Sequence, residues 1–204
     1  TNFGARNAED SEARWSSVTK PALGGIGFYL SFLLALSFNS ILFEQVDLFQ
    51  NSYVIGLITA CSLGFLIGLA DDAYNTNPLL KFLGQVSCGL ILVFSGITIE
   101  IFDLEILNQV LTVLWVVGIM NSINMLDNMD SITTIVSIFV LIGALLFLAM
   151  NGMLNNFDFM MILGVSASLI GFLFHNWNPS KMFMGDTGSQ FLGVLLAVIG
   201  VKYF

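Results

Sequence analysis

The sequence predicts an all-α fold, a polytopic transmembrane helical bundle with about seven spanning segments, and three observations support this class. Hydrophobic residues make up 56% of the 204 residues and charged residues only 10%, whereas a soluble domain has about 45–50% apolar and about 25% charged residues. The apolar residues form long runs, and the polar connectors between them are short. Residues 1–204 are therefore expected to form a single integral-membrane domain.

The apolar runs are expected to be helices because of their length and pattern. A spanning helix needs about 20 mostly apolar residues, whereas a barrel strand has about 9–11 residues of alternating polarity. An open sheet would leave backbone groups without partners in lipid. In chain order, the expected helices are 23–43, 53–70, 82–99, 106–120, 132–150, 159–174 and 191–204.

The charged residues and the cysteines exclude several classes of protein. The net charge of −8 comes from 14 acidic residues and 6 Lys or Arg residues, with no basic patch for nucleic-acid binding. Cys61 and Cys88 lie inside apolar runs without CxxC spacing, which indicates neither a zinc site nor a disulfide framework. We expect both to be small apolar core residues.

The connectors divide into two sides if the chain crosses the bilayer seven times. One side, called side one here, receives the N-terminal stretch and connectors 71–81, 121–131 and 175–190. Its cations are Arg6, Arg14, Lys20, Lys81 and Lys181. The charges in the opposite connectors are all acidic: Glu44, Asp47, Glu100, Asp103, Glu105 and Asp158. Because Lys and Arg in short loops mark the cytoplasmic side, side one is expected to be cytoplasmic.

The first side-one connector contains the adjacent acids Asp71 and Asp72, followed by Lys81 and Gln85. Adjacent carboxylates repel each other, and Mg²⁺ favours one or two carboxylates together with substrate phosphates. Lys81 and Gln85 are four residues apart and so share a helix face. The alternative is a solvated helix end with a lysine whose stem lies along apolar surface.

The second connector repeats a polar residue at every third position: Asn121, Asn124, Asp127 and Asp130. Carboxamides and carboxylates together suit hydrogen bonds to a base, ribose or sugar. The alternative is an N-cap cluster that opens the next helix, which Asp130 fits. A cap would explain only one of these four residues.

The third connector contains Asp186 between two glycines, followed by the hydroxyl residues Thr187 and Ser189. Glycines let the backbone approach a ligand closely, and the amides of such a turn can hold an anion. A lone carboxylate there can reach a metal ion. The alternative is a turn that ends in a Thr187 or Ser189 helix cap. His175, the only histidine, is more often an interfacial residue than a catalyst.

With these connectors on one side, the sequence resembles the polyprenyl-phosphate N-acetylhexosamine-1-phosphate transferases of glycosyltransferase family 4. That family includes phospho-MurNAc-pentapeptide transferase and the GlcNAc-1-phosphate transferases of O-antigen and teichoic-acid synthesis. The resemblance runs from residue 21 to residue 193, and its most specific part is Phe-Met-Gly-Asp-Thr-Gly-Ser at 183–189. The following residues 190–193 resemble the GlcNAc-1-phosphate branch more closely.

The resemblance implies transfer of a sugar 1-phosphate from a UDP-N-acetylhexosamine to undecaprenyl phosphate, with release of UMP. The favoured sugar 1-phosphate is GlcNAc-1-phosphate. It implies envelope polysaccharide synthesis, including lipopolysaccharide, at the cytoplasmic (inner) membrane of a bacterium. Mg²⁺ is the implied cofactor, with Mn²⁺ as an alternative. The implied catalytic residues are Asp71, Asp72, Lys81 and Asp186, and the three aspartates among them would bind the metal ion. The implied substrate-binding residues are Asn121, Asn124, Asp127, Asp130, His175, Asn176, Gly188 and Ser189.

The chain departs from the family at Asn128 and Ser131, where glycine is usual. Either residue allows the turn fewer backbone conformations than glycine does. The family also has an earlier helix and, beyond residue 204, further helices and a histidine-bearing loop. We therefore expect a chain truncated at both ends that binds metal without full activity.

Other functions stay open at this point. Phospho-MurNAc-pentapeptide transfer is the alternative within the family. An ion-coupled transporter would also gather acids and asparagines near helix ends, but usually in broken helices near the midplane and with internal repeats, and we find no repeat. A catalytically inactive scaffolding relative is consistent with the departures. The expected partners are the lipid bilayer and the two substrates, and a homodimer stays open.

Overall fold

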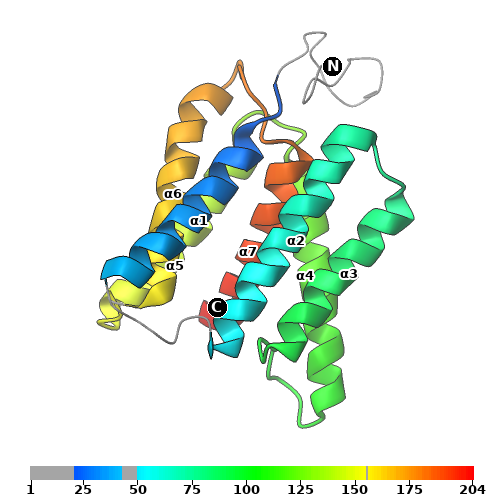
Figure 1. Cartoon of the computed structure of the whole chain (residues 1–204), viewed down its shortest axis with the longest axis vertical. Coiled ribbons are helices and arrows are strands. Elements are labelled where there is room, and N and C mark those ends of the chain that lie inside the picture. Colours follow the sequence, from blue (N-terminus) through cyan, green and yellow to red (C-terminus); the bar gives the residue numbers. More distant parts are fainter. Residues whose placement is uncertain (1–20, 43–49, 155) are drawn as a thin grey trace.

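A computed structural model describes residues 21–42, 50–154 and 156–204. These residues form seven α-helices, which confirms the all-α prediction: α1 Gly24–Leu42, α2 Ser52–Tyr74, α3 Pro78–Phe94, α4 Glu105–Leu126, α5 Ile132–Met150, α6 Phe157–Asn176 and α7 Gly185–Tyr203. Within the described ranges the only extended pairing is a β-bridge between Ala22 and Phe183. Successive helices alternate in direction (Figure 1), as repeated membrane crossing requires.

The helices have the length and surface of membrane spans. Four of the described helices, α2, α4, α5 and α6, are long and apolar enough to cross a membrane, judged by length and composition. Helices α1 and α3 contain shorter apolar stretches, Gly24–Phe38 and Pro78–Phe94. Large apolar side chains such as Leu114, Phe139 and Phe174 are exposed on the outside of the bundle. Lipid accommodates such a surface, so the protein is a multi-pass helical membrane protein.

Helix α7 is the centre of the bundle. It is buried from Gly185 to Ile199, and it packs against α1, α2, α4 and α5. Glycines let its neighbours come close: a Cβ atom at Gly68 of α2 would collide with the backbone of Asp186, and one at Gly193 would lie 2.6 Å from the Cα atom of Met120. Such small residues allow helix backbones to approach each other in membranes. They bring the ends of α2 and α4 against the beginning of α7.

Several helices extend further at the side-one end than the apolar runs predict. Helix α2 continues to Tyr74, α4 to Leu126 and α6 to Asn176, and α7 begins at Gly185 instead of residue 191. Much of each predicted connector is therefore helical. The physical reason is that an apolar run marks the length that lipid surrounds, whereas backbone hydrogen bonds continue into the polar residues beyond it. The motif residues on these end turns are Asp71, Asp72, Asn121, Asn124, His175, Asn176 and Asp186.

The predicted difference in charge between the two ends of the bundle can be compared with the structure for part of the chain. Lys81 lies at the start of α3 and Lys181 in the connector before α7, whereas Glu100, Asp103, Glu105 and Asp158 lie in or next to the connectors that precede α4 and α6. The residues Arg6, Arg14, Lys20, Glu44 and Asp47 lie outside the described residues. The assignment of side one to the cytoplasm stays a prediction.

The end of the bundle opposite to side one contains an ion pair between a buried carboxylate and an exposed lysine. The carboxylate of Asp158 on α6 is 1% exposed and lies 2.6 Å from the Nζ atom of Lys202 on α7. It also accepts hydrogen bonds from the hydroxyl groups of Tyr53, at 2.9 Å, and Tyr203. The Lys202 ammonium group lies 3.6 Å from the centre of the Tyr53 ring. These contacts join α2, α6 and α7 at this end.

Candidate active site

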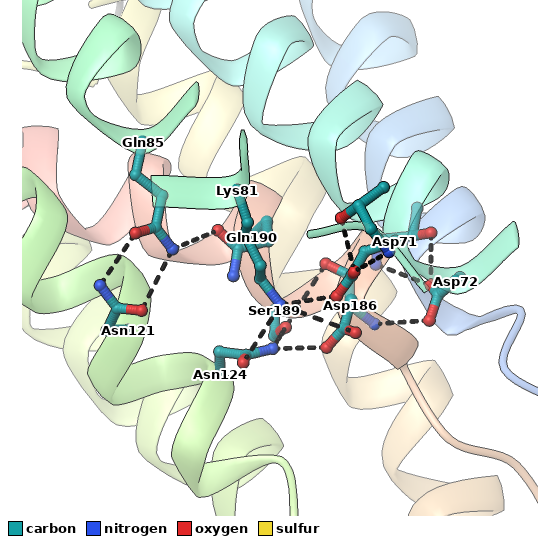
Figure 2. Close-up of polar contacts among 11 residues, drawn as sticks. Asp71, Asp72, Lys81, Gln85, Asn121, Asn124, Asp186, Ser189 and Gln190 are labelled. Atoms are coloured by element: carbon teal, nitrogen blue, oxygen red, sulfur yellow. Dashed lines mark hydrogen bonds and ion pairs between the residues drawn. The ribbon is translucent and has the colours of Figure 1, made fainter. Parts of the chain in front are cut away.

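The side-one ends of α2, α3, α4 and α7 meet around one lysine (Figure 2). The Nζ atom of Lys81 lies 2.8 Å from Asp71 Oδ2 and 3.7 Å from Asp186 Oδ2. Both carboxylates therefore lie against the same ammonium group. The exposed fractions of the side chains are only 17% for Lys81, 9% for Asp71 and 10% for Asp186. The structure thus brings together residues from the first and third predicted motifs.

Asp71 is held in place by the turn that follows α2. Its Oδ1 atom accepts hydrogen bonds from the backbone N–H of Thr76 at 2.9 Å and from the Thr76 hydroxyl at 2.7 Å. The turn is formed by Asn75, whose φ of 49° is left-handed and ends the helix, a conformation that asparagine tolerates better than most residues. Thr76 was not among the predicted site residues. Its signal in the sequence is weak, because one threonine after a helix end is common.

Asp72 binds the backbone at the beginning of α7. Its carboxylate accepts hydrogen bonds from the N–H of Asp186 at 3.0 Å, from the N–H of Thr187 at 2.8 Å and from the Thr187 hydroxyl at 2.7 Å. The N-cap residue Met184 provides no side-chain cap. The alternative interpretation, a Thr187 or Ser189 cap, is therefore wrong, because a carboxylate from α2 binds the N–H groups of the first turn and complements the helix dipole.

Gly185 makes this capping geometry feasible. Its φ of 75° is left-handed, and a Cβ atom there would lie 2.7 Å from Asp72 Oδ2. Only glycine combines that conformation with the close approach of a carboxylate. The glycine before Asp186 therefore serves the junction between α2 and α7.

Asn124 on α4 completes the group around Lys81. Its Nδ2 atom donates to Asp186 Oδ1 at 2.5 Å and to Ser189 Oγ at 2.8 Å, and its Oδ1 atom lies 3.5 Å from Lys81 Nζ. Of the predicted substrate-binding residues, the structure brings Asn124 and Ser189 into direct contact with this group. Asn124 holds the Asp186 carboxylate directly, and Ser189 donates to the Asp186 backbone carbonyl at 3.4 Å.

A cluster of three amides lies one helical turn deeper in the bundle, and we call it the amide layer: Gln85 on α3, Asn121 on α4 and Gln190 on α7. Gln85 Nε2 donates to Asn121 Oδ1 at 3.2 Å and to Gln190 Oε1 at 3.1 Å, and Asn121 Nδ2 donates back to Gln85 Oε1 at 2.9 Å (Figure 2). Gln85 and Gln190 were in the motifs but not among the predicted site residues. Their spacing of four from Lys81 and Asp186 was the available signal.

Asp130 stabilises the neighbouring loop. Its two carboxylate oxygens accept hydrogen bonds from the N–H of Ser180 at 3.0 Å and the Ser180 hydroxyl at 2.7 Å. The N-cap of α5 is Ser131, which makes no side-chain cap hydrogen bond. The alternative interpretation of Asp130 as that cap is therefore wrong, since its side chain is directed to the loop after α6.

The side chain of Asn176 is bonded to other residues of the protein. It is buried, its Oδ1 atom accepts from the N–H of Ser131 at 3.0 Å and from the Thr134 hydroxyl at 2.9 Å, and its Nδ2 atom donates to the Met182 carbonyl at 3.0 Å. Ser131 has a left-handed φ of 68°, which explains why glycine suits this position. Its hydroxyl donates to the Asn176 carbonyl at 2.8 Å. The structure places Asn176 in packing between α5 and α6.

The other predicted residues lie around this centre. Asp127 is the buried C-cap residue of α4. Gly188 packs against Gly25 of α1, where a Cβ atom would lie 3.0 Å from the Gly25 Cα atom. His175 is exposed on the last turn of α6, and its carbonyl accepts hydrogen bonds from the N–H groups of Lys181 and Met182. A substrate role for these residues stays a prediction.

The side chains around Lys81 fit a divalent cation held by two carboxylates. Asp71 and Asp186 both approach the Lys81 ammonium group, at 2.8 and 3.7 Å, and carboxylates that share a site are stabilised by a nearby cation. Mg²⁺ is commonly held by one or two carboxylates, with waters and substrate phosphates as the other ligands. No group of three or more His, Cys, Asp or Glu residues suited to a metal ion occurs in the described part of the chain. Asp72, turned toward the backbone of α7, is thus a weaker candidate ligand than the other two.

Comparison with known proteins agrees with this architecture. The sequence model of glycosyl transferase family 4 matches residues 54–204. A probable undecaprenyl-phosphate N-acetylglucosaminyl 1-phosphate transferase of Bacillus subtilis (strain 168) is 29% identical over 198 residues, which cover 89% of this chain and 51% of that protein. The phospho-N-acetylmuramoyl-pentapeptide-transferase of Streptococcus uberis is 32% identical over 221 residues, which cover 97% of this chain and 64% of that protein.

The fold and the site define a multi-pass membrane protein with a lysine between two carboxylates at one end of its helical bundle. The chain belongs to glycosyl transferase family 4. It spans between about half and two-thirds of the length of the curated relatives described above.

Proposed function

We propose that the protein transfers a sugar 1-phosphate, most specifically GlcNAc-1-phosphate, from a UDP-sugar to undecaprenyl phosphate at the cytoplasmic face of a bacterial inner membrane. The observation that carries this proposal is the position of Lys81 between Asp71 and Asp186, at one end of a membrane bundle of this family. The name of the Bacillus subtilis relative states the same activity for that protein.

In the proposed reaction an oxygen of the lipid phosphate attacks the β-phosphorus of the UDP-sugar. A new phosphoanhydride bond forms, the bond to the oxygen that bridges the two phosphates breaks, and UMP leaves with the electron pair of that bond. Both reactants are anionic, so their approach requires positive charge. Lys81 would hold the lipid phosphate as a compact point charge, and Asp71 would accept the proton of a singly protonated phosphate.

Asp71 and Asp186 are the residues that would hold Mg²⁺ in this proposal, with Mn²⁺ as an alternative ion. The bound ion would neutralise phosphate charge and orient the two substrates. Asn124 would keep the Asp186 carboxylate in one orientation through the hydrogen bond between them. Asp72 would act by holding the first turn of α7, on which Asp186 lies.

An apolar groove next to Lys81 supports a lipid substrate. It has a volume of about 380 Å³ between α2 and α3, with Thr76 and Lys81 at its side-one end. The remaining lining is mostly apolar: Leu63, Leu66, Ile67, Ala70, Leu80, Leu83, Gly84 and Ser87. A prenyl phosphate has an apolar tail and an anionic head, so a groove with a lysine at one end matches both parts. We propose that the groove receives the tail segment nearest the phosphate.

The test is Mg²⁺-dependent UMP release by the full-length protein with polyprenyl phosphate and UDP-GlcNAc. Asp186→Asn should abolish release, and Asp103→Asn, an exposed acid at the opposite end, should keep it. Wild-type activity in Asp186→Asn would contradict the metal assignment. If the wild-type protein releases no UMP from any UDP-N-acetylhexosamine, the transferase proposal is wrong.

Phospho-MurNAc-pentapeptide transfer is the second candidate, because the Streptococcus uberis relative carries that name at similar identity. The same assay with UDP-MurNAc-pentapeptide separates the two donors. Faster UMP release with the pentapeptide donor would replace GlcNAc in the proposal and leave the roles of Lys81 and the carboxylates unchanged.

Two other classes are less well supported. A transporter typically uses broken helices near the bilayer midplane, whereas Asp71 and Asp186 lie on the end turns of α2 and α7. Substrate flux into proteoliposomes without UMP release would favour it. An inactive scaffold would show no UMP release and no thermal stabilisation by Mg²⁺.

A further inference from the structure

We infer that the amide layer of Gln85, Asn121 and Gln190 is a positioning device, which fixes the relative register of α3, α4 and α7 and so sets the distances among the charged groups above it. This inference deepens the proposed function and rests on it. None of the three amides is assigned a chemical step; they would act through Lys81, Asn124 and Asp186.

The first observation is a matched spacing on three helices. Gln85 follows Lys81 by four residues on α3, Gln190 follows Asp186 by four residues on α7, and Asn121 precedes Asn124 by three residues on α4. Residues three or four apart lie on the same face of a helix, one turn above the other. Helices α3, α4 and α7 therefore each bring a polar group to the site and an amide one turn away from it, whereas α2, which brings Asp71, contributes no amide.

The second observation is the pattern of hydrogen bonds. Gln85 and Asn121 exchange a reciprocal pair at 3.2 and 2.9 Å, and Gln85 Nε2 also donates to Gln190 Oε1 at 3.1 Å. Asn121 Nδ2 is tied in addition to its own helix through the carbonyl of Val117 at 2.9 Å. Gln85 is thus the central member, and it links α3 to both α4 and α7.

The burial of two members of the layer is costly for stability. Gln85 is 1% exposed and Gln190 is fully buried, whereas Asn121 is exposed, and a buried amide costs free energy unless all of its groups are bonded. The Nε2 atom of Gln190 has no hydrogen-bond partner among the described residues. Apolar residues of similar volume would avoid this penalty, so the amides provide something that apolar packing does not.

That property is directionality. Apolar contacts are non-directional, whereas an amide pair requires donor and acceptor to face each other. A shift of one residue along a helix moves a side chain by about 1.5 Å along the axis and rotates it by about 100°. Such a shift would break the layer and would also separate Lys81 from Asp186. The layer therefore selects the register in which the charged groups meet.

The experiment compares Gln85→Met and Gln190→Met in the full-length protein with Cys88→Ala, a control for a buried residue one turn deeper on α3. Methionine keeps most of the volume and removes the hydrogen bonds. We expect kcat for UMP release to fall roughly 10- to 100-fold, as small misplacements of reacting groups do, with little change in KM. The control should keep kcat. Unchanged kcat in both methionine variants would overturn the inference.

A second readout does not depend on turnover. The acylation rate of Lys81 by a water-soluble succinimidyl ester, followed by peptide mass spectrometry, reports how firmly the amine is held between its carboxylates. We expect faster acylation in both methionine variants and an unchanged rate in Cys88→Ala. Equal rates in all variants would contradict the positioning role. If the wild-type protein releases no UMP, the transferase proposal fails, and this readout still tests the register.

A double substitution gives the third test. If the layer acts as a unit, Gln85→Met combined with Gln190→Met should lose no more activity than the worse single variant, because one substitution already breaks the link between α3 and α7. If the fold-loss of activity in the double variant equalled the product of the two single fold-losses, the two residues would have independent roles, and the inference would be overturned.

Discussion

Asp72, at the end of α2, accepts hydrogen bonds from both the backbone N–H and the hydroxyl group of Thr187, on the first turn of α7. This contact joins two motifs that are 115 residues apart. It makes the beginning of α7, and with it Asp186, dependent on the end of α2. The paired acids of the first motif therefore have different environments: Asp71 faces Lys81, whereas Asp72 faces a helix N-terminus.

Removal of this cap should destabilise the protein. We expect Asp72→Ala to lower the free energy of unfolding by about 1–2 kcal/mol, because N–H groups of the first turn lose their acceptor. Asp72→Asn should lose less, because its one carbonyl oxygen can still accept a hydrogen bond. Its NH2 group cannot replace the second acceptor oxygen, and the attraction between charge and dipole also disappears. Thermal unfolding in detergent measures both variants. Stability of Asp72→Ala equal to that of the wild type would contradict the capping role.

Substitution of Lys81 should separate cation binding from phosphate binding. Lys81→Met removes the ammonium group between Asp71 and Asp186, so the two carboxylates should attract Mg²⁺ more strongly while the lipid phosphate loses its partner. We expect a larger rise of Tm on Mg²⁺ addition than in the wild type, together with loss of UMP release. A smaller Mg²⁺ shift in Lys81→Met would show that the lysine does not compete with a cation.

Close helix packing at Gly68 should be essential. Gly68→Ala places a methyl group against the backbone of Asp186 and Thr187, which should push α7 away from α2 and lower both Tm and activity. Gly171 on α6 is the matched control, because a Cβ atom there meets nothing within 4 Å. Gly171→Ala should be neutral or stabilising by about 0.5–1 kcal/mol, as expected for a helix interior. Equal effects of the two substitutions would refute the packing explanation.

Ser131 should respond differently to glycine and to alanine. Both substitutions remove its hydroxyl hydrogen bond to Asn176, but only alanine retains the strain of a left-handed φ of 68°. We expect Ser131→Gly to be more stable than Ser131→Ala by about 1 kcal/mol, measured by denaturant or thermal unfolding. The reverse order would mean that the left-handed turn is not present in the folded protein.

The buried carboxylate of Asp158 at the opposite end should contribute to stability and not to chemistry. Asp158→Ala leaves Lys202 without its carboxylate and removes the acceptor of the Tyr53 hydroxyl, so we expect a loss of a few kcal/mol. UMP release per folded molecule should stay near the wild-type value at low temperature. The control is Asp103→Asn, at an exposed acid of the same end, which should leave Tm unchanged.

Hydropathy and spacing in the sequence were sufficient for the helical membrane class, because a spanning helix needs a long apolar run and leaves a strong local signal. They also placed Asp71, Lys81 and Asp186 in motifs on one side of the bundle, and the structure brings these residues together. The regular spacing of Gln85 from Lys81 was visible, but its partners were not.

Only the tertiary structure decided which partner each polar residue has. Local patterns suggested a cap at Asp130 and at Thr187 or Ser189, but Asp130 binds Ser180 and the cap of α7 comes from Asp72. Hydrogen bonds form between groups that the fold brings within about 3 Å, whatever their distance along the chain. For the same reason, the pairing of Gln85 with Gln190 became visible only when the fold brought the two side chains within 3.1 Å of each other.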